Sequence, residues 1–204
     1  MLKLEVPGGE NKVLLHSCCA PCSGAVLECL LANGIRPVVF FSNSNITPFE
    51  EYELRRGELA RYCKSLGVEM VDDEYNHDAW RAFVLNGSPE ELAAAPERGP
   101  RCFNCFRFRL KRAAEYAAAR GIPVLTTTLA SSRWKSLEQV AAAGLWACNN
   151  YKPEEHPVLF WPQNWRKGGL QPRRAEIICE QNFYNQTWCG CEFSLTPHLR
   201  QPSR

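Results

Sequence analysis

The sequence predicts an α/β fold in which a parallel sheet is flanked by helices, followed by a less regular, helical C-terminal part. Over the first 145 residues, short apolar runs typical of buried strands alternate with helical patterns. Strands joined by helical crossovers run parallel, with right-handed connections, so their carboxyl ends share one edge of the sheet. The length of 204 residues suits one domain over residues 1–204.

The expected elements follow in order, and a glycine ends several of the helices, at Gly34, Gly67 and Gly121. Residues 161–172 (WPQNWRKGGLQP) have the composition of a loop. We expect strands at residues 13–17, 37–42, 68–71 and 122–127, and helices at residues 23–33, 50–66, 77–92, 102–120, 137–144 and 173–181.

Polar sequences follow each expected strand. They are HSCCAPC, SNSN, DDEYNHD and TTTLASS, in chain order. Ligands of open parallel sheets bind at the carboxyl ends of the strands, so we expect the functional site there.

Charge and hydropathy limit the possible partners. The formal net charge is only +2, although residues 98–112 carry six basic side chains and no acid, which indicates a basic face or an ordinary solvated helix face. The first residues, MLKLEVPGGENK, contain no apolar stretch of signal-peptide length. No segment reaches the roughly 18 uninterrupted apolar residues of a membrane span. We therefore expect a cytoplasmic protein without membrane contact.

Eleven cysteines are the strongest anomaly of the composition. In a reducing compartment cysteines serve metal binding or redox chemistry more often than structural disulfides. Cys18, Cys19 and Cys22 fall in the first strand-to-helix turn, where the positive end of the helix favours thiolates. Structural packing is the alternative for this group.

Two further cysteine pairs stand out. Cys102 and Cys105 begin a long helix with a spacing that puts both sulfurs on one face, which suits zinc, a redox dithiol or an iron–sulfur cluster. Cys189 and Cys191 are spaced so closely that a disulfide between them would be strained, which favours an exchangeable redox pair over a metal-ligand pair or a structural role. The isolated cysteines are assigned to packing: Cys29, Cys63, Cys148 and Cys179.

Six motifs in register give the chain a resemblance to the QueH-type epoxyqueuosine reductases, from about residue 10 to residue 200: HSCCAPC, SNSNITPFEEYELRR, GPRCFNCFRFRL, TTTLASS, RKGGLQ and WCGCEFS. The resemblance implies a HUP-like (Rossmann-like) α/β domain. It also implies a 4Fe-4S cluster with an additional mononuclear iron, and reduction of epoxyqueuosine in tRNA to queuosine with an external electron donor.

The resemblance also implies roles for particular cysteines. The cluster ligands would be Cys18, Cys19, Cys102 and Cys105. The additional iron would lie near Cys22, and the catalytic redox pair would be Cys189 and Cys191. The reaction also needs protons, and the candidate donors are a metal-bound water, His16, or a carboxylic acid such as Asp72 or Asp73.

Substrate contacts are expected in the basic segment after residue 165. Arg166, Lys167, Gly168 and Gly169 combine charge with a flexible turn that suits anticodon-loop phosphates. Base stacking or simple packing is expected of Trp165, Trp188 and Tyr184. The competing functions are a tRNA thiolase of related fold, disfavoured because SCCAPCSG replaces the phosphate-binding loop, and a zinc-binding module without enzymatic activity.

Overall fold

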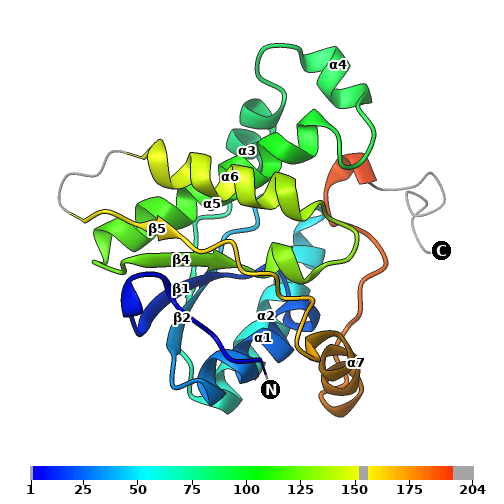
Figure 1. The fold of residues 1–204 in the computed structure, drawn as a ribbon. Coiled ribbons are helices and arrows are strands. Elements are labelled where there is room, and N and C mark those ends of the chain that lie inside the picture. The colour runs from blue at the N-terminus through cyan, green and yellow to red at the C-terminus, as the bar shows by residue number, and fades with distance from the viewer. Residues whose placement is uncertain (1, 152–155, 195–204) are drawn as a thin grey trace.

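The computed structural model describes residues 2–151 and 156–194, and its centre is an all-parallel sheet of five strands in the order β3-β2-β1-β4-β5 (Figure 1). The strands are β1 (Lys12–His16), β2 (Arg36–Phe41), β3 (Met70–Asp72), β4 (Val124–Thr127) and β5 (Leu159–Phe160). The helices are α1 (Ala20–Ala32), α2 (Phe49–Leu66), α3 (His77–Val84), α4 (Pro89–Ala94), α5 (Pro100–Ala119), α6 (Leu137–Asn149) and α7 (Leu170–Glu180), with the short 3₁₀ helices η1 (Pro7–Gly9), η2 (Thr128–Ser131) and η3 (Glu192–Ser194).

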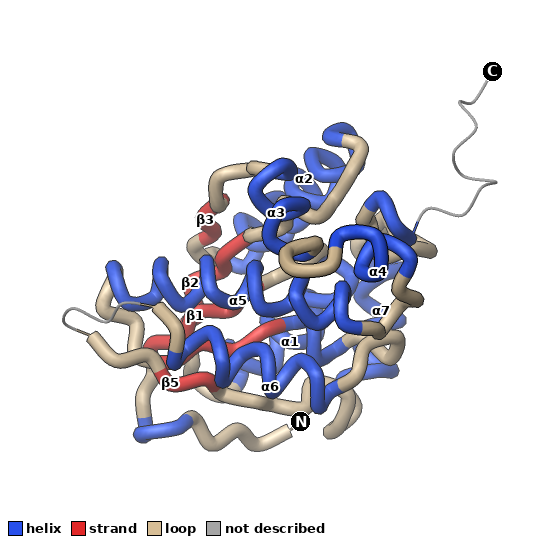
Figure 2. Tube along the Cα trace, turned by 90° about the horizontal axis from the view of Figure 1, so that it is seen from above, coloured by secondary structure: helices blue, strands red, loops and turns tan. Residues whose placement is uncertain are grey.

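Helices cover both faces of this sheet, as the α/β prediction requires. Helices α1, α2 and α7 lie on one face, and α5 and α6 lie side by side on the other (Figures 1 and 2). Helix α3 packs against α5 rather than against the sheet. Within the described ranges, no helix is both long and apolar enough to cross a membrane.

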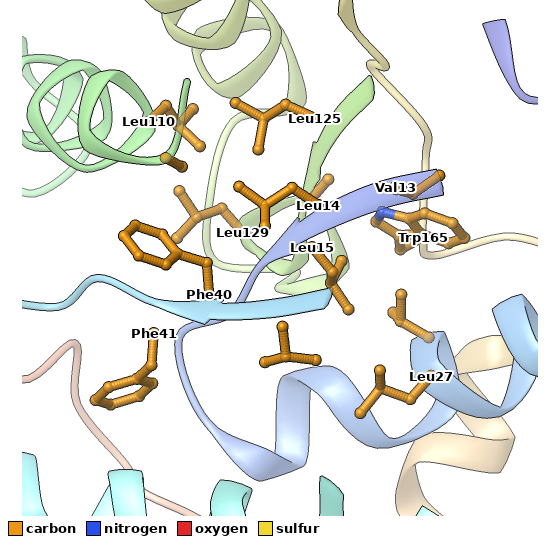
Figure 3. Close-up of a cluster of buried hydrophobic side chains, with 14 of the residues drawn as sticks. Val13, Leu14, Leu15, Leu27, Phe40, Phe41, Leu110, Leu125, Leu129 and Trp165 are labelled. Atoms are coloured by element: carbon orange, nitrogen blue, oxygen red, sulfur yellow. The ribbon is translucent and has the colours of Figure 1, made fainter. Parts of the chain in front are cut away.

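The core explains why the first strand is a continuous apolar run. Leu14 points to the α5 side, toward Leu110, whereas Leu15 points to the α1 side, toward Leu27 (Figure 3). Successive side chains of a strand alternate between the two faces, and both faces of a parallel sheet are covered, so both positions must be apolar. Leu14 and Leu15 are accordingly fully buried.

One predicted helix differs from the structure, and one short strand of the structure was not predicted. The helix expected at residues 77–92 is divided into α3 and α4, because Gly87 adopts a left-handed φ of 96° and Pro89 begins a new helix. Strand β5 was not predicted. It has only two residues and is fixed by pairing with β4, where Leu125 lies opposite Phe160.

The sheet has a topological switch between β1 and β4, because the chain passes from β1 outward to β2 and β3 and then returns to the other side of β1. The loops after β1 and β4 therefore leave in different directions and open a crevice at their carboxyl ends. A hydrogen bond from the Cys18 amide to Thr128 Oγ1, 3.2 Å long, joins the two loops at this point.

Candidate metal and redox site

A cavity of about 590 Å³ opens at the carboxyl ends of the strands. Its wall is built from the turn after β1, the loop after β2, the beginning of α5, the loop after η2 and the segment between α7 and η3. In Figure 1 that last segment, in orange, runs from α7 to η3, so it brings the C-terminal part of the described chain to the carboxyl ends of the strands. Six cysteines from three separate parts of the chain line the cavity: Cys18, Cys22, Cys102, Cys105, Cys189 and Cys191.

The turn after β1 holds the closest group of thiols. The sulfurs of Cys18, Cys19 and Cys22 all lie within 4.8 Å of one another, and the Cys18 and Cys19 sulfurs are 3.7 Å apart. Hydrogen bonds from the other two thiols lower the pKa of Cys18 well below its ordinary value, and the positive charges of Lys135 and Arg109 lower it further. Three soft donors, one of them favoured as a thiolate, can bind a metal ion.

Cys102 and Cys105 lie in the first two turns of α5, on the wall of the same cavity. The Arg98 amide donates a hydrogen bond of 3.3 Å to the Cys102 sulfur. Burial raises the pKa of Cys102 to about 11 and also raises that of Cys105. Both thiols are therefore protonated at neutral pH, and a metal would have to displace their protons in order to bind them.

Cys189 and Cys191 lie in the segment between α7 and η3, and both thiols are free. Gly190 between them adopts a φ of 103°, and its carbonyl accepts a 2.8 Å hydrogen bond from the Thr47 amide. Arg55 donates a hydrogen bond of 3.1 Å to the Cys189 carbonyl. These contacts fix the C-x-C turn against the loop after β2 and the helix α2.

The two thiols of this pair differ in acidity. A hydrogen bond from Cys191 lowers the pKa of Cys189 well below its ordinary value, and the charges of Lys135, Arg109 and Arg55 act in the same direction. The same hydrogen bond, together with burial, raises the pKa of Cys191. Cys189 is thus the thiolate of the pair, and thiolates are the attacking groups in disulfide exchange.

Two cations supply much of the positive charge that favours these thiolates. Arg109 is 2% exposed and donates hydrogen bonds to the Ser42 carbonyl (3.1 Å) and to Asn43 Oδ1. No carboxylate pairs with Arg109 in the part of the chain that the structure describes. Burial would lower the pKa of the Lys135 ammonium, but the negative charges of Cys189, Cys18 and Cys22 raise it above its ordinary value.

The remaining cysteines lie away from this cavity. Cys29 and Cys63 are buried in the core, and burial raises the pKa of Cys63 to about 12. Cys148 is half-buried and Cys179 is exposed. None of the four lines the cavity.

The candidate proton-donor side chains also lie outside the cavity lining. His16 is completely buried below the cavity, and its two ring nitrogens contact Thr127 Oγ1 (2.7 Å) and the Ser42 carbonyl (3.2 Å). Asp73 accepts hydrogen bonds from Ser42 and Arg112, and Asp72 pairs with Arg56. None of the three lines the cavity.

The segment expected to bind substrate phosphates lies outside the cavity lining. Arg166 donates hydrogen bonds to the carbonyls of Ser132 and Lys135, the latter 2.6 Å long, and so fixes the loop after η2. Lys167, Gly168 and Gly169 are exposed on the surface before α7. Substrate binding by these four residues stays a prediction.

Of the three aromatic residues considered for base stacking, only Trp188 lines the cavity. The stacking role for Trp165 is wrong, because Trp165 is completely buried, in edge contact with Trp161. Tyr184 is 36% exposed and donates a hydrogen bond to Glu51, away from the cavity wall.

Sequence reasoning did not identify several residues that line the cavity. They are Trp80, Trp134, Lys135, Gln139 and Gln186. Each occurs without a recognisable motif, and the position of Trp134 and Lys135, shortly after the polar end of β4, was the only available signal. Three amide side chains of the wall keep a buried oxygen without a hydrogen-bond partner among the described residues, and these are Asn45, Gln139 and Gln186.

Comparison with known proteins identifies the family to which the chain is similar. The family model described as "Epoxyqueuosine reductase QueH" matches residues 13–197. Proteins named epoxyqueuosine reductase QueH from Haemophilus influenzae and Acinetobacter baylyi are 44% and 43% identical, each over 95% of this chain and over 75% and 85% of their own lengths. The protein of that name from Thermotoga maritima is 31% identical over 90% of both chains.

Proposed function

The chain belongs to the epoxyqueuosine reductase QueH family, and on that basis we propose that it is an oxidoreductase that reduces epoxyqueuosine in cytoplasmic tRNA to queuosine. The observation that carries the proposal is the cavity at the topological switch, where cysteines from three segments of the chain meet. Epoxide deoxygenation is a reduction, and such a concentration of thiols suits metal and redox chemistry rather than phosphate binding.

The residues present fit an iron–sulfur cluster. A 4Fe-4S cluster takes four cysteine thiolates, and the proposed set is Cys18, Cys19, Cys102 and Cys105. Cys18, Cys102 and Cys105 line the same cavity, and Cys19 is buried directly beside Cys18 in the turn after β1. The buried cation Arg109, which lacks a carboxylate partner among the described residues, suits an anionic group in this place.

Cys22 is proposed as a ligand of an additional iron. Its sulfur lies within 4.8 Å of those of Cys18 and Cys19, and it also lines the cavity. A metal held by Cys22 would therefore adjoin the proposed cluster. When bound, these metal groups would supply single-electron transfer and a Lewis acid.

The protein's own thiols meet the electron demand of the reaction. Converting the epoxide to an alkene and water consumes two electrons and two protons. Oxidation of the Cys189 thiolate and the Cys191 thiol to one disulfide releases two electrons and one proton, so one turnover of the pair supplies the electrons for one turnover of substrate, and solvent supplies the second proton. An external donor would then return the disulfide to the dithiol.

The walls of the cavity also suit a nucleobase. Asn45, Gln139 and Gln186 contribute amide side chains to the wall. A base removed from its stack presents amino, ring N–H and carbonyl groups, which are the groups that amide side chains bind. We assign these three amides to substrate orientation.

The proposal is tested with anaerobically purified protein. Its absorbance spectrum and its iron and sulfide contents report the cluster. Its activity is measured on tRNA that contains epoxyqueuosine, with a chemical reductant, by mass spectrometry of the released nucleosides. We expect iron, sulfide and conversion to queuosine.

Two other outcomes would overturn the proposal. A colourless protein that contains zinc and converts no substrate would be a binding module. Sulfur transfer to tRNA that depends on ATP, without epoxide reduction, would identify a thiolase.

A further inference from the structure

A second pocket, of about 400 Å³, adjoins the cavity. The two share four lining residues, Arg98, Ser132, Trp134 and Arg174, so the second pocket opens directly beside the first. It contains no cysteine, and the proposed reduction makes no use of it.

This second pocket, called the side pocket below, has a strongly basic lining. Arg98, Arg133 and Arg174 contribute to it, and no acidic residue does. Within the described residues none of these arginines forms an ion pair, and the guanidinium of Arg174 has one long hydrogen bond, 3.4 Å, to Asn185. Gln171, in the first turn of α7, brings the positive end of that helix to the same place. A group with negative charge is the natural ligand.

An exposed aromatic ring stands beside these charges. The side chain of Trp134 is 79% exposed, which is unfavourable for so large an apolar surface unless a ligand covers it. Its loop is nevertheless held in place, because Arg166 donates hydrogen bonds to the carbonyls of Ser132 and Lys135 on either side. The ring is therefore a flat surface on a fixed backbone.

We propose that the side pocket binds the nucleotide that neighbours the reacting one, with its base stacked on Trp134 and its phosphate bound by Arg133 and Arg174. This inference rests on the proposed function, because it needs an RNA strand whose next nucleotide enters the cavity. Single-stranded RNA offers this combination of an unstacked base and an adjoining phosphate. A ligand that offers only a phosphate would leave the Trp134 ring uncovered.

The test measures affinity for an unmodified, fluorescently labelled anticodon stem-loop by anisotropy over a range of salt concentrations, without reductant. Trp134→Ala should raise the Kd about tenfold, because base–aromatic stacking contributes strongly, and should leave the salt dependence unchanged. Arg133→Ala and Arg174→Ala should each reduce the slope of log K against log salt concentration by about 0.7, the value for one phosphate of a single strand.

Two control variants lie away from the side pocket. Arg36→Ala removes an exposed arginine at the amino-terminal end of β2, on the opposite edge of the sheet, and should change neither Kd nor slope. Tyr184→Ala removes a partly exposed aromatic side chain that lines neither cavity. Equal thermal unfolding midpoints would show that the variants are folded.

The inference is overturned if Trp134→Ala binds like the wild-type protein, if the arginine variants keep its salt slope, or if the wild-type protein does not bind the stem-loop. Failure of the proposed function is recognised separately. A protein that shows the expected binding pattern but does not convert epoxyqueuosine would retain the nucleotide pocket and lose the reductase assignment.

Discussion

Replacing Gly144 with alanine tests how α6 packs on the edge of the sheet. A Cβ atom at Gly144 would lie 2.1 Å from the nearest atom of the Phe160 ring in β5, whereas ordinary contacts of a Cβ begin at 3.4 Å. The ring would therefore have to withdraw by about 1.3 Å, the difference between these two distances. Phe160 is only 7% exposed, so this movement disturbs a packed contact.

The magnitude follows from two opposing effects. Overpacking of this kind costs about 1–3 kcal/mol, while alanine in place of glycine within a helix gains about 1 kcal/mol. We expect Gly144→Ala to lower the free energy of unfolding by about 1 kcal/mol, and the melting temperature by about 2–4 °C for a chain of this size.

Gly57 provides the matched control in thermal unfolding by circular dichroism. It lies within α2, and a Cβ there would meet nothing within 4 Å, so Gly57→Ala should raise the melting temperature. Adding Phe160→Leu to Gly144→Ala should restore part of the lost stability, which a double-mutant cycle would detect. A melting temperature of Gly144→Ala at or above that of the wild-type protein would refute the described contact between α6 and β5.

Four further predictions concern the cysteines. Cys18→Ser should lower the iron content of anaerobically purified protein, whereas Cys63→Ser should not, because Cys63 lies in the core away from the cavity; equal iron contents would contradict the ligand set. The double variant Cys189→Ser, Cys191→Ser should keep its iron and lose turnover with the physiological donor, and loss of iron instead would make the pair metal ligands. Because burial raises the pKa of Cys63 from 9.0 to about 12, its contribution to stability should be complete below pH 9 and be lost as the pH rises toward 12, which urea unfolding at increasing pH would measure. At pH 8 iodoacetamide should therefore modify the exposed Cys179 in the folded protein and Cys63 only after unfolding, as peptide mass spectrometry would show.

The order of strands and helices was predictable because local patterns determine it. Apolar runs such as residues 13–17 can only be buried strands when helical patterns alternate with them, and the polar ends of these strands indicated the position of the cavity. Strand β5 was not predictable in this way. Its two residues are too short to show a period, and they form a strand only because β4 offers a free edge.

Prediction of the site was limited by residues that carry no local signal. The three cysteine groups were visible as motifs, and the structure brings residues of all three to one cavity. Trp134 and Lys135 contribute to the cavity through tertiary placement alone, since an isolated tryptophan or lysine is as common in loops without function. Trp165 shows the reverse, because an aromatic residue in a loop-like sequence is completely buried.

The position of residues 185–191 has a consequence for how the protein is made. These residues form a wall of the cavity, and Arg55 of α2 holds them through the carbonyls of Trp188 and Cys189. A chain emerges from the ribosome from its N-terminus, so Cys18, Cys22, Cys102 and Cys105 are synthesised long before the wall that covers them. During translation these thiols are made before the wall that covers them, so oxidants and other thiol reagents can reach them before the cavity closes.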